Sequence, residues 1–125
     1  MAARLPVALL AERDPYVVQQ LRKTLSGLVD LTVVSAAGEA LATARALKPD
    51  IIITTVLLPD FDGYQLCRRL RDDDVLKSIP ILMISVLDSP QVAIRAGADA
   101  FLAKPLDDDR LRQVIARLVA RAKAA

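Results

Sequence analysis

Short apolar runs alternate with amphipathic stretches along the whole chain. The apolar runs last only a few positions, which predicts buried strands. The stretches between them place apolar residues at helical spacing and begin at polar capping residues, which predicts helices. The predicted strands span 7–11, 31–35, 50–55, 79–85 and 100–102. The predicted helices span 14 to about 27, 38–47, 62 to about 71, 89–96, and 107 onward.

Five strand–helix units with short connections predict a parallel sheet with helices on both faces, joined by right-handed crossovers. The chain has 125 residues, the usual size of one domain, so we assign residues 1–125 to a single α/β domain. In such a fold, functional groups lie just past the carboxyl ends of the strands. The polar residues expected there are Glu12, Arg13, Asp14, Thr54, Thr55, Asp60, Asp62, Ser85 and Lys104.

Composition narrows the classes of partner and chemistry. The net charge is +2, from 17 basic and 15 acidic residues, which is too small a bias to favour a nucleic acid or a membrane surface as partner. The single cysteine allows no internal disulfide, and the chain has no histidine, the commonest general base and metal ligand. No run approaches the roughly 18 apolar residues of a membrane span. We therefore expect a cytoplasmic domain.

Several short motifs follow one another in a specific order and spacing, although each is weak alone. They are AERDP at 11–15, KPD at 48–50, LPDFDG at 58–63, IPILMIS at 79–85, AGAD at 96–99 and FLAKPL at 101–106. On these motifs, nearly the whole chain resembles the receiver domain of two-component response regulators. The resemblance implies a single flavodoxin-like (βα)5 domain, a doubly wound parallel sheet with strand order 2-1-3-4-5.

The resemblance also implies a site. Typical receivers take a phosphoryl group from a histidine kinase onto an aspartate at the end of the third strand, beside Mg²⁺ held by two acidic residues after the first strand. A hydroxyl after the fourth strand and a lysine before a proline contact the phosphoryl oxygens, and an aromatic residue on the fifth strand changes position with the switch. Ser85, Lys104 and Phe101 match these three positions, and Glu12 matches the first acid.

Two positions depart from the family pattern. Arg13 stands where the second acidic metal ligand should be, and Thr55 stands at the phosphoacceptor position. Mg²⁺ requires anionic oxygen ligands, which a guanidinium cannot supply. A threonine hydroxyl is a poor nucleophile without an adjacent base. We therefore expect a pseudo-receiver with no metal cofactor and no catalytic residue, a signalling module that is not an enzyme and acts by protein–protein contact without aspartyl phosphorylation.

A hypothesis about the pocket follows from these departures. Ion pairs and hydrogen bonds among Glu12, Arg13, Thr55, Ser85 and Lys104 would hold it closed, with Arg13 in part replacing the metal ion. The alternative is that these side chains extend separately into solvent, where exposed ion pairs contribute little.

Other functions stay open at this stage. A phosphoryl group could be carried by Asp60 or Asp62, or a Ser/Thr kinase could modify Thr55 or Thr54. A small α/β enzyme is a weaker alternative. The stretch 85–97 is about one helical turn shorter than is usual in the family, so we expect a reshaped face formed by the fourth helix, fifth strand and fifth helix, through which receivers dimerise. The sequence leaves open whether the chain acts alone or belongs to a larger protein.

Overall fold

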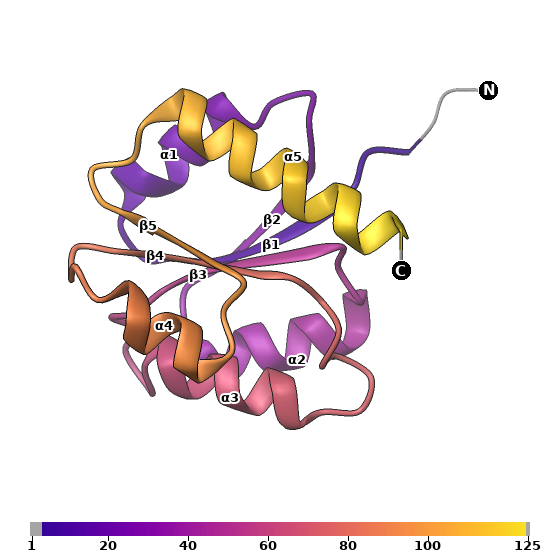
Figure 1. The fold of residues 1–125 in the computed structure, drawn as a ribbon, viewed down its shortest axis with the longest axis vertical. Helices are drawn as coiled ribbons and strands as arrows, with labels where there is room; N and C mark the ends of the chain where they lie inside the picture. The colour runs from indigo at the N-terminus through magenta and orange to yellow at the C-terminus, as the bar shows by residue number, and fades with distance from the viewer. Residues whose placement is uncertain (1–3, 125) are drawn as a thin grey trace.

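The computed structural model describes residues 4–124, which form one five-stranded parallel sheet between two layers of helices (Figure 1). The strands are β1 (Val7–Ala11), β2 (Asp30–Val34), β3 (Ile51–Thr55), β4 (Ile81–Ser85) and β5 (Ala100–Ala103). The helices are α1 (Pro15–Thr24), α2 (Ala37–Leu47), α3 (Gly63–Asp72), α4 (Pro90–Ala96) and α5 (Asp108–Ala124). The strand order β2-β1-β3-β4-β5 confirms the predicted flavodoxin-like topology.

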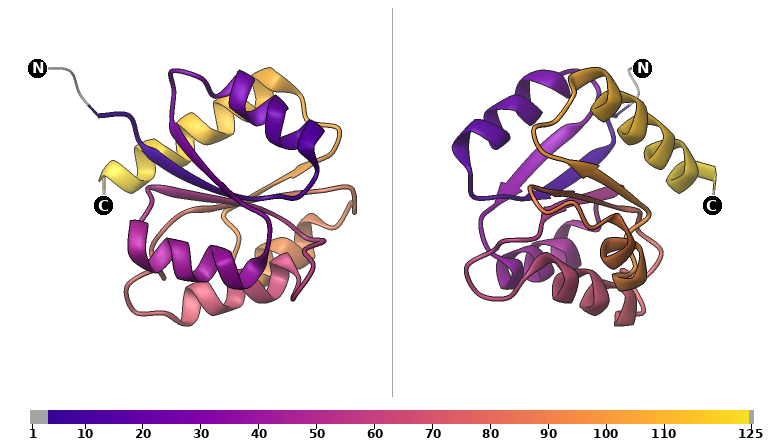
Figure 2. Two further views of the ribbon diagram at one scale, coloured as in Figure 1. Left: turned by 180° about the vertical axis from the view of Figure 1, so that it is seen from behind. Right: turned by 60° about the vertical axis from the view of Figure 1, so that its left-hand side comes forward.

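The helices divide between the two faces of the sheet. Helices α1 and α5 cover one face, and α2, α3 and α4 cover the other, as the views in Figures 1 and 2 agree. The central strands are buried on both faces, because their residues point alternately into two apolar clusters. Leu9, Ile52 and Met83 face α2–α4, whereas Leu10 and Ile53 face α1 and α5.

Local capping explains where most helices begin. The Asp14 side chain accepts a hydrogen bond from the Tyr16 N–H, and Pro15 occupies the first position of α1, as the sequence predicted. Helix α4 has seven residues, starts at Pro90 and ends at Gly97 in the left-handed conformation (φ 116°). The predicted short fourth helix is therefore present.

Several predicted boundaries are wrong by a few residues. Helix α1 ends at Thr24, about three residues early, because residues 25–28 form a turn. Strand β2 lies one residue earlier than predicted. Strand β4 begins at Ile81, two residues late, because Pro80 has no N–H and the Ile79 carbonyl accepts a hydrogen bond from the Arg71 guanidinium instead. Within residues 4–124, no helix combines the length and the apolar character needed to cross a bilayer.

Candidate functional site

The carboxyl ends of four strands bring the predicted site residues to one edge of the sheet. Glu12 directly follows β1, Thr55 ends β3, Ser85 ends β4, and Lys104 directly follows β5. Backbone hydrogen bonds extend the sheet into this edge, from Glu12 N to Val34 O (3.0 Å) and from Lys104 N to Ser85 O (2.8 Å). The backbone that carries these side chains is therefore fixed by the sheet itself.

Lys104 is the centre of a small polar cluster. Its Nζ donates hydrogen bonds to Glu12 Oε1 at 2.6 Å and to Thr55 Oγ1 at 3.1 Å. The Lys104 side chain is 13% exposed and the Glu12 side chain 2%, so water screens this ion pair only weakly. We call Glu12, Thr55 and Lys104 the lysine cluster.

Both oxygens of the Glu12 carboxylate accept hydrogen bonds. While Oε1 accepts from Lys104, Oε2 accepts hydrogen bonds from the backbone N–H groups of Arg13 (3.0 Å) and Asp14 (3.1 Å). A buried carboxylate is stable when it is paired and hydrogen-bonded, and this one has a cation and two backbone donors. Sequence reasoning did not identify these backbone donors, which come from the turn into α1.

The predicted pocket forms only in part, because Arg13 does not join it. The Arg13 side chain is exposed, and among residues 4–122 no hydrogen bond or ion pair of its guanidinium is found. Lys104 and the backbone already satisfy Glu12, so Arg13 is not needed to neutralise it. The hypothesis that Arg13 replaces the metal ion next to Glu12 is therefore wrong for this structure.

Ser85 lies beside Lys104 at the end of β4, whereas Phe101 lies farther back on β5, and both side chains have partners outside the lysine cluster. The Ser85 side chain is buried, and its Oγ accepts a hydrogen bond from the Leu87 N–H at 2.9 Å. Phe101 is half-buried and packs against the apolar cluster beneath α2–α4. The Ser85 hydroxyl thus shapes the connection from β4 to α4, and Ser85 meets Lys104 through the backbone, by the hydrogen bond from Lys104 N to Ser85 O.

The end of β3 is tightly enclosed. Thr54 and Thr55 are both buried, and the Thr54 hydroxyl donates to the Thr55 carbonyl at 2.9 Å. Gly63, the first residue of α3, packs so closely that a Cβ there would lie 2.1 Å from the Thr55 carbonyl oxygen. The Pro-Asp-Phe-Asp-Gly motif therefore ends in the one residue type that lets α3 begin against the end of β3.

Asp60 and Asp62 act as helix caps. Asp60 accepts hydrogen bonds from Ala37 N (2.9 Å) and Gly38 N (2.7 Å) at the start of α2. These bonds, from Gly38 first and then Ala37, lower the pKa of the Asp60 carboxyl below its usual value of 3.8. Asp62 accepts from Gln65 N (2.9 Å) at the start of α3. Both carboxylates thus satisfy backbone donors at helix N-termini.

The lysine cluster does not fit a magnesium ion. Mg²⁺ needs an octahedral shell of oxygen ligands, usually including one or two carboxylates. Here the Glu12 carboxylate already accepts three hydrogen bonds, one from an ammonium group, and the neighbouring side chain is a guanidinium. Within the described part of the chain, no group of three or more His, Cys, Asp or Glu side chains lies close enough to hold a metal ion.

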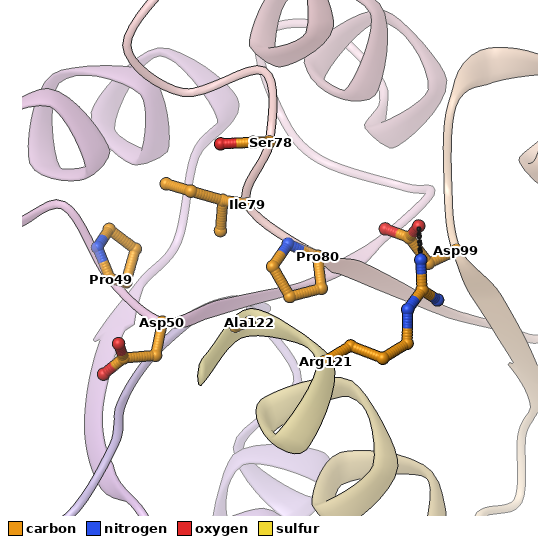
Figure 3. A pocket seen from close by; sticks show the side chains of 8 residues that line it. All are labelled: Pro49, Asp50, Ser78, Ile79, Pro80, Asp99, Arg121 and Ala122. Carbon is orange, nitrogen blue, oxygen red and sulfur yellow. Dashed lines mark hydrogen bonds and ion pairs between the residues drawn. The ribbon is translucent and has the colours of Figure 1, made fainter. Parts of the chain in front are cut away.

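A cavity of about 440 Å³ lies at the opposite edge of the sheet, where β3, β4 and β5 begin (Figure 3). In this view Pro80 and Ala122 separate Asp50 from a facing pair, Asp99 and Arg121. Asp50 accepts a hydrogen bond from Val7 N (2.7 Å), and Asp99 accepts one from Ile81 N (2.8 Å). The two carboxylates that line this cavity, Asp50 and Asp99, are thus hydrogen-bonded to backbone N–H groups of the sheet.

Comparison with protein families gives a clear result for most of the chain. The family described as "Response regulator receiver domain" matches residues 8–116. Response regulator PleD of Caulobacter vibrioides is 43% identical over 72 residues, which cover 55% of this chain and 16% of PleD. Response regulator Rre1 of Synechocystis is 31% identical over 122 residues, which cover 94% of this chain and 53% of Rre1. The chain therefore spans about half the length of these curated relatives, or less.

Solved structures agree with the sequence comparison. The signal receiver domain of a signal transduction histidine kinase from Syntrophus aciditrophicus superposes with a TM-score of 0.86 and is 31% identical. The superposition covers 96% of this chain and 94% of that domain. The similarity thus extends over the whole fold, including the edge that carries the lysine cluster.

Proposed function

The chain belongs to the response regulator receiver family, and on that premise we propose that it is a pseudo-receiver, a signalling module that works without aspartyl phosphorylation and without bound Mg²⁺. Its output, on this proposal, is contact with partner proteins. It is not an enzyme, and residues 1–125 act as one cytoplasmic domain. The free, buried thiol of Cys67 suits a reducing compartment.

One observation carries this proposal. Lys104 Nζ lies 2.6 Å from Glu12 Oε1 and 3.1 Å from Thr55 Oγ1. In a phosphorylated receiver the lysine would contact an added phosphoryl group, whereas here it already has an internal anion and a hydroxyl. The neutral Thr55 hydroxyl supplies no carboxylate nucleophile, and the chain has no histidine to activate it.

The geometry gives little support to phosphorylation at Asp60 or Asp62. A phosphoryl group on Asp60 would turn one of its two accepting oxygens into a bridging oxygen, so that one N–H group at the start of α2 would lose a good acceptor, and a phosphoryl group on Asp62 would disturb the cap of α3. Both losses would destabilise helix termini by roughly 0.5–2 kcal/mol each.

The geometry also disfavours a Ser/Thr kinase as the modifying enzyme. Thr55 is 4% exposed and Thr54 is fully buried, so neither hydroxyl could enter a kinase active site while β3 is folded. A small α/β enzyme gains no support either, because the cluster's carboxylate is bound in an ion pair and no histidine is available as a base.

A homodimer through α4, β5 and α5 stays a prediction. The seven-residue α4 supports a face that is reshaped relative to that of longer receivers. Sedimentation of the protein at several concentrations would test it.

The proposal is tested with a small phosphodonor. The protein is incubated with acetyl phosphate and Mg²⁺, and its intact mass is measured at neutral pH. We expect no added phosphoryl group on the natural sequence. The matched control is the double variant Arg13→Asp/Thr55→Asp, which restores both a second acid and a carboxylate nucleophile. We expect it to gain one phosphoryl group when Mg²⁺ is present and none when Mg²⁺ is left out of the incubation.

Each outcome has a defined meaning. Stoichiometric addition of a phosphoryl group to the natural sequence would refute the proposal, and peptide mapping would identify Asp60, Asp62 or another residue as its site. Phosphorylation of the double variant together with an unmodified natural protein would support it, because the same scaffold would then be shown to be competent.

A further inference from the structure

The cavity at the amino-terminal edge of the sheet (Figure 3) is separate from the lysine cluster, which lies at the other ends of the strands. Its walls come from the segments that lead into β3, β4 and β5 and from the end of α5. Its volume of about 440 Å³ lies within the range of about 300–1,000 Å³ that is usual for small-molecule sites in proteins. The cavity therefore has the size of a ligand site, and only the complete fold forms it.

The middle of the cavity is apolar. Pro49, Ile79, Pro80 and Ala122 line it. Both prolines are buried, and Ile79 packs against the apolar cluster beneath α2–α4, so these walls are held in place by the fold. A proline has a rigid ring and no N–H, so the two prolines present apolar surface without a backbone donor. A molecule in the cavity would therefore gain free energy by covering this apolar surface.

The two carboxylates of the cavity already have partners within the protein. Asp50 Oδ2 accepts a hydrogen bond from Val7 N at 2.7 Å, and Figure 3 shows the Asp50 carboxylate turned away from the middle of the cavity. Asp99 Oδ2 accepts hydrogen bonds from the Arg71 guanidinium (2.7 Å) and from Ile81 N (2.8 Å). The charge of Asp99 is thus neutralised by Arg71. These bonds make a cationic molecule the less favourable occupant of the cavity.

Arg121 is the charged group of the cavity that the fold leaves available. Within residues 4–122, its guanidinium has one polar contact, to Asp99 Oδ1 at 3.5 Å, and its side chain is 61% exposed. This contact is longer than an ordinary charged hydrogen bond, and such an exposed pair contributes little to stability. In Figure 3 the Arg121 side chain rises from α5 beside Pro80, so its N–H groups border the apolar walls. A guanidinium in this place can donate two parallel hydrogen bonds to one carboxylate.

We propose that this cavity binds a small organic acid, a molecule with one carboxylate and an apolar body of one or two rings. The carboxylate lies on Arg121, and the apolar body lies against Ile79, Pro80 and Ala122. Such a ligand ties the end of α5 to the segments that lead into β3 and β4. This binding site goes beyond the proposed function and does not depend on it, because the residues that line the cavity include none of the lysine cluster.

Amide chemical shift titrations of the whole 125-residue chain test this binding site. The probes are 1-naphthylacetate, its neutral amide 1-naphthylacetamide, and acetate, which keeps the carboxylate and lacks the rings. We expect 1-naphthylacetate to give saturable shifts at the N–H groups of Ser78, Ile79 and Asp99. The amide should bind about fivefold more weakly or worse, because it carries no charge for Arg121, and acetate should not saturate, because it covers little apolar surface.

Two variants separate the contribution of the charge from that of the walls. Arg121→Gln should weaken binding of 1-naphthylacetate about fivefold and leave binding of the amide nearly unchanged. Ala122→Leu should weaken binding of both naphthyl compounds, because a larger side chain then occupies part of the cavity. The matched control is Arg117→Gln, an exposed arginine one turn earlier on α5 without an ion pair among residues 4–122, which should change the affinity for 1-naphthylacetate less than about twofold.

Any one of three results would overturn the proposal: no saturable shift at the cavity with 1-naphthylacetate, equal affinities for the acid and its amide, or equal effects of Arg121→Gln and Arg117→Gln. Thermal unfolding of each variant shows that it remains folded. Failure of the proposed function is detected separately, because it appears as phosphorylation of the natural sequence in the acetyl phosphate experiment and involves the opposite edge of the sheet.

Discussion

The two edges of the sheet both hold a cation paired with a carboxylate, but the pairs have different surroundings. At the amino-terminal edge, Arg71 pairs with Asp99 at 2.7 Å, with side chains 23% and 20% exposed. At the carboxyl edge, Lys104 pairs with Glu12 at 2.6 Å, with side chains 13% and 2% exposed. The distances are nearly equal, so the difference lies in what else each cation contacts.

The amino-terminal pair completes the backbone hydrogen bonding of the fold. Besides Asp99, the Arg71 guanidinium donates to three carbonyl oxygens, at 2.7 to 2.9 Å. These carbonyls belong to Lys77, Ile79 and Gly97. Asp99 in turn accepts from the N–H of Ile81. Arg71 thus joins α3 to the segments that lead into β4 and β5 and satisfies their carbonyls.

At the carboxyl edge, the lysine of the ion pair donates its hydrogen bonds to side chains and not to backbone carbonyls. The two hydrogen bonds of Lys104 Nζ go to side chains, the Glu12 carboxylate and the Thr55 hydroxyl. The strand ends are held independently, by the backbone bonds of Glu12 and Lys104 to neighbouring strands. The comparison teaches that the strand ends at the carboxyl edge are held by backbone bonds of their own, whereas the opposite edge relies on one arginine side chain to satisfy several carbonyls.

The largest expected effect is at the amino-terminal edge. Arg71→Met should lower the free energy of unfolding by about 3 kcal/mol, because it leaves three carbonyls without this donor and removes the short ion pair of a half-buried carboxylate. Chemical denaturation measures this change. The matched control is Arg121→Met, which removes a longer contact to the same Asp99 (3.5 Å, arginine side chain 61% exposed) and should cost less than about 0.5 kcal/mol. Equal costs for the two variants would remove the distinction drawn between the edges.

A smaller effect is expected at the carboxyl edge. Lys104→Met should cost about 2 kcal/mol, because Glu12 stays buried and charged but keeps its two backbone donors. Adding Glu12→Gln should recover part of that loss, since the neutral amide oxygen needs no cation. A double-mutant cycle measured by denaturation gives the coupling between the two side chains. If Glu12→Gln only added to the loss, the pair would contribute no coupling and the lysine cluster would not be a unit.

The fold could be predicted from the sequence because its determinants are local. Apolar runs a few residues long set the strands, and the Asp14-Pro15 pair sets the start of α1. The predicted boundary of a strand was wrong where a side chain distant in sequence determines the end of that strand. The start of β4 depends on Arg71, which comes from the preceding helix and takes the carbonyl of Ile79.

The site was less predictable for the same reason. The motifs bring Glu12, Thr55 and Lys104 to one edge of the sheet. Which basic side chain pairs with Glu12, however, depends on how the side chains are placed in three dimensions. The turn into α1 gives Glu12 two backbone donors, and Lys104 takes the remaining oxygen, which leaves Arg13 exposed. The role of Asp60 was also hidden, because its partners at the start of α2 lie 22 and 23 residues away in sequence.

The smallest expected effect concerns acid sensitivity at the carboxyl edge. The folded-state pKa of Asp60 lies below its usual value of 3.8 because Gly38 N and Ala37 N donate to the carboxylate. Asp60 therefore contributes stability above pH 3.8, and this contribution is lost as the pH falls through the folded-state pKa. Asp60→Asn should be less stable than the natural protein at neutral pH, and the gap should narrow on acidification, as measured by denaturation at neutral pH and at about pH 3.

This last variant also sharpens the comparison between the edges, because it asks whether a carboxylate from the connection after β3 serves only to cap a helix. The control is Asp88→Asn, an exposed residue without a hydrogen bond among residues 4–122, whose effect on stability should be small at both pH values. A gap that stays constant between the two pH values would mean that the charge of Asp60 does not stabilise α2. Its assignment as a helix cap would then fail, and Asp60 would return as a candidate phosphoacceptor.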